Sequence, residues 1–299
     1  MTLGDLLIER GPMTGAQLQS ATGRDAFDLW RASRLDRELY SVIVGQRYVR
    51  LDIQLPGYER LSPSIQREFA DYTVIGHFTQ RAAVEERAEQ VRDRIAKVTH
   101  RKLLLAGRIV DDVCGRYLDD PATAEHFCVV VAGDIAYGMS HEVPRPERST
   151  GVLVNGSDLD LVVLLSDDAP EGLAGELDDR MYKKKFQLLR NPAHKEEIDY
   201  IVKNMATLEK QSAYDTFQHM VASKIFIECQ YLRGSEELFQ QGKELMRTSG
   251  ALEKLRRMRA RATEARIHNE ERLLASTSGV LDPDELVLFR TAEESEEFE

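Results

Sequence analysis

The sequence lacks the features that mark membrane, secreted or disulfide-stabilised proteins. No apolar run approaches the roughly 18 residues that span a bilayer. The first residues, MTLGDLLIERG, have neither the charged nor the apolar region of a signal peptide. The three cysteines have no paired spacing, which indicates buried thiols in a reducing compartment. The protein is therefore expected to be cytoplasmic and to have no membrane partner.

Several binding and catalytic motifs are also missing. The seven histidines include no pair at metal-ligand spacing beside a cysteine pair. There is no Gly-x-Ser-x-Gly elbow and no phosphate loop ending in Gly-Lys-Ser or Gly-Lys-Thr. The formal net charge of −11 argues against a protein that coats nucleic acid, since such binding depends on cationic contacts with phosphates, but it leaves room for a local basic groove. With 42% hydrophobic residues, the 299-residue chain is long enough for two or three packed domains.

Two carboxylates lie beside a glycine-rich turn between two apolar runs in the middle of the chain. The runs at 128–132 and 159–165 have the length and β-branched content of buried strands. Asp158 and Asp160 lie where the second run begins. Because side chains alternate across a strand, residues two apart face the same way, and both carboxylates are expected to converge on one cation. Hard cations such as Mg²⁺ or Mn²⁺ take oxygen ligands of this kind.

A third carboxylate, Asp199, lies within the apolar run 198–202, which also has the pattern of a strand. Three strand-borne carboxylates suffice to hold two metal ions. Two such ions about 3.5–4 Å apart activate an attacking hydroxyl and stabilise the leaving pyrophosphate of an in-line displacement. An ordinary solvated turn is the alternative interpretation of an Asp-x-Asp motif by itself, and the third acid in the right order favours the metal site.

These pieces resemble the polymerase-β-like nucleotidyltransferases. In that family a strand ends in Gly-Ser or Gly-Gly, a short helix follows, a second strand carries acid-x-acid, and a later strand carries a third acid. The matching segments are GDIAYG at 133–138, SDLDL at 157–161 and IDY at 198–200. The resemblance implies transfer of a nucleoside monophosphate from a nucleoside triphosphate, such as ATP, to an acceptor hydroxyl. It makes Asp158 and Asp160 ligands of both metals and Asp199 the ligand of the metal that activates the acceptor.

The resemblance also implies nucleotide-binding residues around the carboxylates. In the family, a serine after the first glycine helps to bind the triphosphate. Here that position is Asp134, whose charge repels phosphate unless a metal or another cation intervenes. A second pair, Gly156 and Ser157, lies next to the carboxylates and is a candidate to supply the missing contacts. The turn at Gly133 is expected to present backbone N–H groups to the phosphates. The other candidates on this turn are Tyr137 and Gly138.

Two lysines complete the predicted nucleotide site. Lys183 lies in a predicted helix at 171–189, where a lysine can neutralise triphosphate charge as a point cation. An ordinary solvated helix face is the alternative for this residue. Lys224 opens the stretch KIFIECQYLRG at 224–234, which is similar to the helix ending in a small turn that follows the catalytic core in many of these transferases. Members of the family use that helical region to close over the nucleotide or the acceptor.

The N-terminal pattern resembles a winged helix-turn-helix, because three predicted helices are followed by a predicted hairpin. Arg31 and Arg34 on the third helix are the candidates for DNA contact. Residues 1–60 carry eight Lys and Arg against eight Asp and Glu, and this balance favours protein docking or acceptor positioning as the alternative. The predicted helices are at 3–9, 14–22 and 25–35, and the predicted strands are at 39–44 and 47–51, joined by a two-residue turn.

The most basic stretch of the chain lies at 254–266 and includes Arg256 and Arg257. It is a candidate surface for RNA or another polyanion, and on this basis RNA or tRNA is the first choice for the acceptor. Glutamates lie close by, so a mixed-charge surface helix is the alternative. The other acceptors compatible with the sequence are a protein hydroxyl, a small molecule and a second nucleotide.

The patterns together predict an α+β protein. Its nucleotidyltransferase fold, a small mixed β-sheet with flanking helices, is preceded by a winged helix-turn-helix and followed by a helical region. The rival hypothesis is a DNA-binding or scaffold regulator with an inactive nucleotidyltransferase fold, for which Asp134 is the motivating residue. The predicted parts are a winged-helix-like domain at 1–56, a connector at 57–78, a nucleotidyltransferase core at 79–205, and a C-terminal helical region at 206–299 that ends in an acidic tail.

Overall fold

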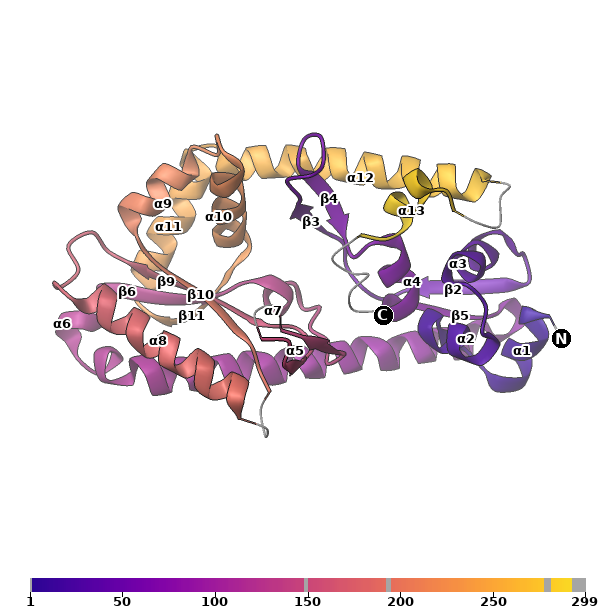
Figure 1. The fold of residues 1–299 in the computed structure, drawn as a ribbon, viewed down its shortest axis with the longest axis horizontal. Helices are drawn as coiled ribbons and strands as arrows, with labels where there is room; N and C mark the ends of the chain where they lie inside the picture. Colours follow the sequence, from indigo (N-terminus) through magenta and orange to yellow (C-terminus); the bar gives the residue numbers. More distant parts are fainter. Residues whose placement is uncertain (1, 148–149, 192–194, 277–280, 292–299) are drawn as a thin grey trace. The chain divides into compact units, whose positions relative to one another are not determined.

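The computed structural model describes residues 2–147, 150–191, 195–276 and 281–291. Within these ranges the chain is a mixed α+β protein with small sheets, as predicted (Figure 1). It divides into two compact units: an N-terminal unit of Met1–Arg94 and Arg259–Glu299, and a central unit of Ile95–Met258. The four-part division drawn from the sequence stays a prediction, and its acidic tail lies outside the described residues.

Side-chain caps start the helices of the N-terminal unit. Thr14 accepts a hydrogen bond from the backbone N–H of Gln17, whose side chain accepts one from the backbone of Thr14, so α2 begins with a capping box. The helices pack around Phe27 and Trp30, and Phe289 from the end of the chain belongs to the same core. The helices of this unit are α1 (Leu3–Arg10), α2 (Gly15–Thr22), α3 (Ala26–Leu35), α4 (Ile65–Tyr72) and α13 (Pro283–Phe289).

The strand pairing in the N-terminal unit differs from the predicted hairpin. β2 (Leu39–Ile43) pairs with β5 (Thr73–His77), while β3 (Tyr48–Leu51) pairs with β4 (Glu59–Ser62). β5 also pairs with β1 (Met13–Thr14), so the three-stranded sheet has the order β1-β5-β2. The prediction of a hairpin between β2 and β3 is therefore wrong. The reason is that β5 is buried along its whole length and gives β2 an apolar partner, whereas most of β3 is half-exposed.

The central unit contains a four-stranded mixed sheet in the order β10-β9-β6-β11. Its strands at the predicted positions are β6 (Phe127–Val131), β9 (Leu159–Leu165) and β10 (Ile198–Asn204). β9 runs parallel to β10 and antiparallel to β6. The apolar runs predicted β6 and β9 well because almost every residue in these two strands is buried.

The fourth strand of this sheet, β11 (Gln230–Gly234), corrects a prediction of helix. α10 (Phe217–Glu228) ends before it, and β11 then pairs antiparallel with β6 at the edge of the sheet. Its sequence, QYLRG, contains no apolar run, and its register against β6 is irregular between Tyr231 and Arg233. The strand therefore owes its conformation to pairing with a distant segment, which a local pattern does not reveal.

Helices cover both faces of the central sheet (Figure 1). On one face, Leu159, Leu161 and Val163 of β9 pack into a core with residues of α5 and α8. Because side chains alternate along a strand, Asp160 lies on the opposite face, which α7, α10 and α11 cover. The helices are α5 (Arg81–Leu118), α6 (Pro121–Ala124), α7 (Gly133–Tyr137), α8 (Leu173–Arg190), α9 (Met205–Ser212) and α11 (Glu236–Thr248).

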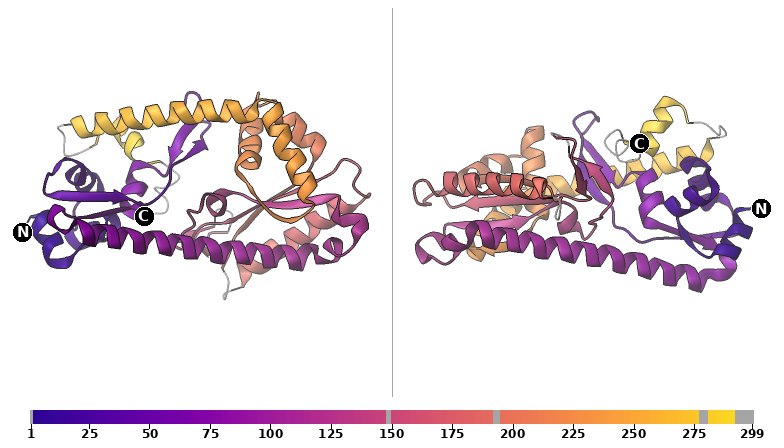
Figure 2. Two further views of the ribbon diagram at one scale, coloured as in Figure 1. Left: turned by 180° about the vertical axis from the view of Figure 1, so that it is seen from behind. Right: turned by 60° about the horizontal axis from the view of Figure 1, so that its bottom comes forward.

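Two long helices contribute residues to both units, namely α5 and α12 (Ala251–Ala275). Figure 2 shows α5 as one uninterrupted helix. Between α7 and β9, the short strands β7 (Pro144–Pro146) and β8 (Leu153–Asn155) pair with each other. None of the helices in the described part of the chain has the length and apolar content needed to cross a bilayer.

Candidate metal and nucleotide site

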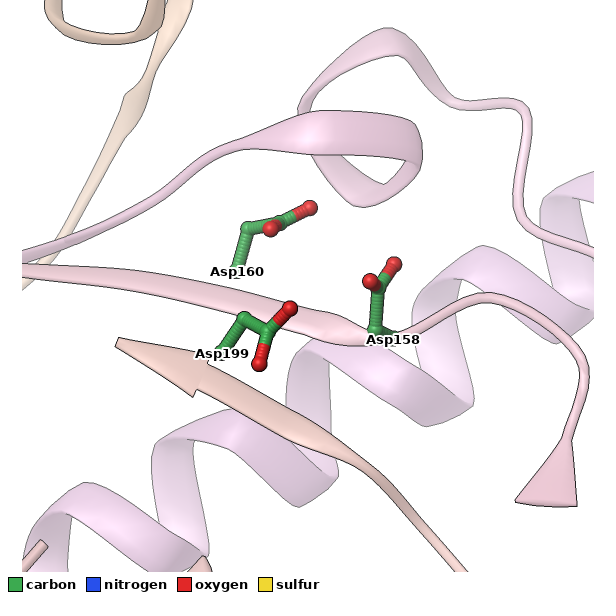
Figure 3. A group of neighbouring side chains, drawn as sticks. All are labelled: Asp158, Asp160 and Asp199. Atoms are coloured by element: carbon green, nitrogen blue, oxygen red, sulfur yellow. The ribbon is translucent and has the colours of Figure 1, made fainter. Parts of the chain in front are cut away.

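The three predicted carboxylates lie together on one face of the central sheet. β9 and β10 run parallel with Asp160 and Asp199 in register, so both side chains leave the sheet on the same face. Asp158 precedes β9 and joins them, and one oxygen atom of each carboxylate lies within 4.8 Å of the others. Figure 3 shows the three side chains on this face. The structure thus brings together the residues that the sequence indicated.

Burial and the negative charges nearby disfavour the ionised forms of Asp158 and Asp160. Burial, and then the negative charges of Asp158, Asp134 and Asp199, raise the pKa of Asp160 well above its ordinary value. Burial also raises the pKa of Asp158, although the guanidinium of Arg145 opposes this shift. A divalent cation among the carboxylates would offset the lost hydration and remove the repulsion. The all-oxygen donor set therefore fits Mg²⁺ or Mn²⁺.

A glycine makes room for one of the three carboxylates. Gly133 has φ +60°, a region that L side chains rarely adopt, and a Cβ there would lie 1.9 Å from Oδ2 of Asp160. Gly138 ends α7 in the left-handed conformation with φ +68°, and nothing lies within 4 Å of an added Cβ. At position 133 glycine is therefore required because a side chain would clash with Asp160. At position 138 it is favoured by the left-handed backbone conformation alone.

Asp134 and Ser157 are hydrogen-bonded to each other. Oγ of Ser157 donates to Oδ2 of Asp134 at 2.7 Å and accepts from the backbone N–H of His141 at 3.1 Å. Gly156, with φ +66°, packs so closely that a Cβ would lie 2.1 Å from the carbonyl oxygen of His141. The Gly156–Ser157 pair therefore holds the segment before β9 against the residues that follow α7. The hydroxyl of Ser157 is therefore engaged by Asp134.

Tyr137 and Lys224 link α7 to α10. Nζ of Lys224 lies 2.5 Å from Oη of Tyr137 and 2.7 Å from Oε2 of Glu228. Tyr137 donates a hydrogen bond to the same carboxylate. The Lys224 ammonium also lies 5.1 Å from the centre of the Tyr137 ring. Both predicted residues thus come together, and Glu228, which the sequence reasoning did not name, balances the lysine's charge.

Of the lysines on α8, Lys185 reaches the carboxylates. Its Nζ lies 2.7 Å from Oδ1 of Asp199, whereas the predicted Lys183 is exposed and makes no ion pair with any described residue. Burial lowers the pKa of Lys185, but the hydrogen bond and charge of Asp199 outweigh that effect and raise it. The sequence contained a pattern that could have identified Lys185. This lysine lies four residues after the buried Met181 and three before the buried Leu188, so it falls on the same side of the helix.

Arg145 on β7 is a site residue that the sequence reasoning missed. Its Nη2 lies 2.9 Å from Oε2 of Glu197 and 3.5 Å from Oδ2 of Asp158. Its Nε donates a hydrogen bond to the carbonyl oxygen of Gly156 at 3.0 Å. Burial raises the pKa of Glu197, and Arg145 opposes the shift. An arginine between two prolines in a loop carries no local pattern of a binding site.

Lys102 on α5 was also missed, and it fixes the backbone that leads into β9. Its Nζ donates to the carbonyl oxygens of Asn155 at 2.7 Å and Ser157 at 2.6 Å, and it pairs with Glu196 at 2.7 Å. The side chain is buried. Its charged neighbours in the sequence are typical of an exposed helix face, so only the tertiary contacts assign it this role.

A cavity of about 720 Å³ opens beside Asp160 and Asp199, a volume typical of small-molecule sites. It follows β10 at the edge of the sheet, with Tyr182 and Phe186 of α8 and Ile225 of α10 in its walls. The cavity therefore joins two of the three carboxylates to an apolar and aromatic surface.

The four arginines predicted to contact nucleic acid are not part of the carboxylate cluster. In the N-terminal unit, the guanidinium of Arg31 packs over an aromatic ring, and Nη2 of Arg34 lies 3.5 Å from Glu270. Arg256 and Arg257 are exposed on α12, and Arg256 lies near a glutamate of the same helix. Binding of DNA or RNA by these residues stays a prediction.

Comparison with known proteins finds no family model, no curated protein and no solved structure that matches this chain. The functional argument therefore rests on the residues and their geometry.

Proposed function

We propose that the central unit is a metal-dependent nucleotidyltransferase, which moves a nucleoside monophosphate from a nucleoside triphosphate to an acceptor hydroxyl. The observation that carries the proposal is the group of three carboxylates, Asp158, Asp160 and Asp199, whose oxygens lie within 4.8 Å of one another. The order of elements supports it: β6, a glycine turn, the short helix α7, the β7–β8 pair, β9 with Asp158 before it and Asp160 on it, α8, and the parallel strand β10 with Asp199. This order agrees with the polymerase-β-like fold that the sequence resembles.

In the proposed reaction, bound Mg²⁺ or Mn²⁺ would supply the positive charge that activates the hydroxyl and stabilises the leaving pyrophosphate. Asp158 and Asp160 would hold the ions, and Asp199 would complete the set on the acceptor side. The acceptor oxygen forms a bond to the α-phosphorus, the bond from this phosphorus to the oxygen bridging to the β-phosphate breaks, and pyrophosphate leaves. Asp199 is placed to take the proton of the hydroxyl, and Lys185 orients its carboxylate.

The geometry also suggests how the chain compensates for Asp134. The hydroxyl of Ser157 is directed to Asp134, so it does not replace the serine that binds triphosphate in the family. Arg145 is the cation held next to Asp158. A guanidinium binds phosphate oxygens through paired N–H groups, so Arg145 is the residue we assign to the triphosphate.

A transfer assay tests the proposed function. The full-length protein is incubated with each labelled nucleoside triphosphate, Mg²⁺ or Mn²⁺, and total cellular RNA. The Asp158→Ala, Asp160→Ala variant is expected to lose at least about 100-fold in transfer, since removing only a partner of a metal ligand costs about 10–100-fold. Asp119→Ala, which removes an exposed acid after α5, is the matched control and is expected to retain activity.

The result separates the transferase from a regulator. Transfer that requires the intact carboxylates supports the proposal, and the labelled product identifies the acceptor as RNA, protein or a small molecule. Equal transfer by the carboxylate variant contradicts it. Absence of transfer together with absence of triphosphate binding in calorimetry supports the rival, in which Asp134 has disabled the site.

For the N-terminal unit, we propose a winged-helix-like module that docks protein or positions the acceptor. Three helices and the sheet order β1-β5-β2 support this architecture. The pairing of Arg34 with Glu270, and of Arg47 with Glu68 and Glu270, occupies cationic groups that would otherwise contact phosphates. Salt-dependent binding of duplex DNA by the full chain, weakened by Arg31→Ala with Arg34→Ala, would instead support DNA recognition.

A further inference from the structure

We propose that the cavity beside Asp160 and Asp199 is the acceptor subsite, and that it binds a nucleoside, which has a planar base and a ribose without phosphate. A hydroxyl of this ribose is the group that attacks the triphosphate. The inference rests on the proposed transferase function and adds the chemical class of its acceptor. It is carried by the place of the cavity, its aromatic wall and its charge.

The place of the cavity assigns it to the acceptor side of the reaction. Four consecutive residues of the edge strand β10, beginning at Asp199, line it, and so does Asp160. Asp158 and the turn at Gly133 are not among its lining residues in the described part of the chain. A molecule in the cavity therefore meets the carboxylate cluster at Asp199, the residue placed to accept the proton of the attacking hydroxyl.

The wall of the cavity offers a surface for a flat ring. Tyr182 is 56% exposed, although a large aromatic side chain gains stability from burial. It packs edge-on against Phe186, with ring centres 4.8 Å apart, so Phe186 supports one side of the ring. Tyr200 and Ile225 add further apolar surface. Exposed aromatic rings that are held in place are platforms on which nucleobases stack, whatever their sequence.

The charge of the cavity favours an acceptor without phosphate. Its lining includes three carboxylates, Asp160, Asp178 and Asp199, and one ammonium, Lys185. Lys185 is already paired with Asp199. Even when cations neutralise Asp160 and Asp199, the negative charge of Asp178 still balances the positive charge of Lys185. The part of the cavity that holds the acceptor therefore offers no net positive charge to a phosphate. The volume of about 720 Å³ is ample for a nucleoside.

The proposed step is balanced without another reactant. A ribose hydroxyl oxygen of the nucleoside bonds to the α-phosphorus of the triphosphate, and the bond between this phosphorus and the bridging oxygen breaks. Pyrophosphate leaves, the proton passes to Asp199 and then to solvent, and the product is a dinucleoside monophosphate.

Binding of nucleosides provides a test that does not depend on turnover. Adenosine, guanosine, cytidine and uridine are titrated into the full-length protein with Mg²⁺ and without triphosphate. We expect saturable binding that Tyr182→Ala and Phe186→Ala each weaken by about 10-fold or more, as loss of a stacking partner does. Tyr182→Phe keeps the ring and is expected to bind like the wild type. Leu104→Ala, which removes an apolar side chain that is 53% exposed on α5, is the control.

The transfer assay supplies the second arm, with the same nucleosides as acceptors beside an oligoribonucleotide. The inference requires a labelled dinucleoside product, and a KM for the nucleoside that rises in Tyr182→Ala while the KM for triphosphate stays unchanged. Transfer only to the oligoribonucleotide or to protein, or nucleoside binding that is equal in Tyr182→Ala, overturns the inference and leaves the transferase standing. If no transfer to any acceptor depends on the carboxylates, the proposed function itself is overturned.

Discussion

The backbone at Gly133 leaves no room for a side chain beside Asp160. The two residues are far apart in sequence, yet a single added carbon at Gly133 would lie 1.9 Å from the carboxylate oxygen. Glycine is required here both by the positive φ and by the lack of space. The position is therefore suited to test whether the carboxylates act as one site.

We expect Gly133→Ala to displace Asp160 and to weaken Mn²⁺ binding by at least about 10-fold. The control is Gly138→Ala, which meets the same backbone strain, about 1–2 kcal/mol, but no clash. The Mn²⁺ affinities of both variants are measured by titration, and their thermal stabilities are measured by thermal unfolding. Equal metal affinity in the two variants would show that the contact at Gly133 does not support the site.

The ionisation of Asp160 predicts how stability without metal depends on pH. Its pKa in the folded protein is well above the ordinary value of 3.8, so above that pH the folded state binds more protons than the unfolded state. The contribution of Asp160 to the free energy of unfolding is therefore complete below about pH 4, and it is lost as the pH rises through the raised pKa.

Asp160→Asn removes this dependence, because the amide does not titrate. In EDTA, we expect the Tm of the wild type relative to that of Asp160→Asn to fall as the pH rises above about 4. Added Mg²⁺ is expected to raise the Tm of the wild type and to leave the variant largely unchanged. A difference in Tm that does not change with pH would argue against a raised pKa.

At the scale of elements, the side chain of Arg145 attaches the β7–β8 pair to the site. Arg145 contacts the residues before β9 and before β10 at once, through Gly156, Asp158 and Glu197. Without it, the carboxylate of Glu197, only 7% exposed, would remain buried without its cation.

We expect Arg145→Gln to lower the free energy of unfolding by about 2 kcal/mol, less than for a fully buried pair because the arginine keeps some exposure. Adding Glu197→Gln is expected to restore part of the loss, since the buried charge is then removed. Arg101→Gln breaks an exposed pair with Glu142 and serves as the control, with a change of about 0.5 kcal/mol or less. Urea unfolding measures these variants together with Glu197→Gln alone, and additive effects of the two single variants would contradict the coupling.

The elements also show which patterns a sequence carries. Strands β6 and β9 were predictable because continuous burial requires continuous apolar residues. β11 was not, because it is short, lies at a sheet edge with one of its five residues buried, and follows a helix. The partner of β2 was also not predictable, because a nearby strand and a distant one satisfy the same local pattern and burial decides between them.

At the scale of the whole molecule, the N-terminal unit is made from both ends of the chain. Phe289 of α13 packs against Phe27 and Trp30 of α3, with ring centres 5.3 Å and 5.7 Å apart, and is 2% exposed. Arg266 of α12 pairs with Glu68 and Glu270 and donates to the carbonyl oxygen of Pro63. The last described helices are therefore structural parts of the N-terminal core.

We expect Phe289→Ala to destabilise the N-terminal unit by about 3 kcal/mol, because it leaves a cavity in a packed aromatic cluster. Trp30 is the only tryptophan of the chain, so tryptophan fluorescence follows the unfolding of this unit. In Phe289→Ala the emission maximum is expected to shift to longer wavelength. Val287→Ala, on the same helix but 65% exposed, is the control. Unchanged stability and emission in Phe289→Ala would contradict a structural role for α13.

The sequence by itself determined the strands β6, β9 and β10 and identified the three carboxylates that lie together. Strand periodicity placed Asp158 and Asp160 on one face and marked Asp199 on another strand, because alternation is a local property of the backbone. Only the tertiary structure decided which cations meet them. Arg145 and Lys185 reach the carboxylates from two separate elements, and Lys102 of a third element pairs with Glu196 and holds the backbone before β9. Such contacts depend on distances between segments that no local pattern encodes.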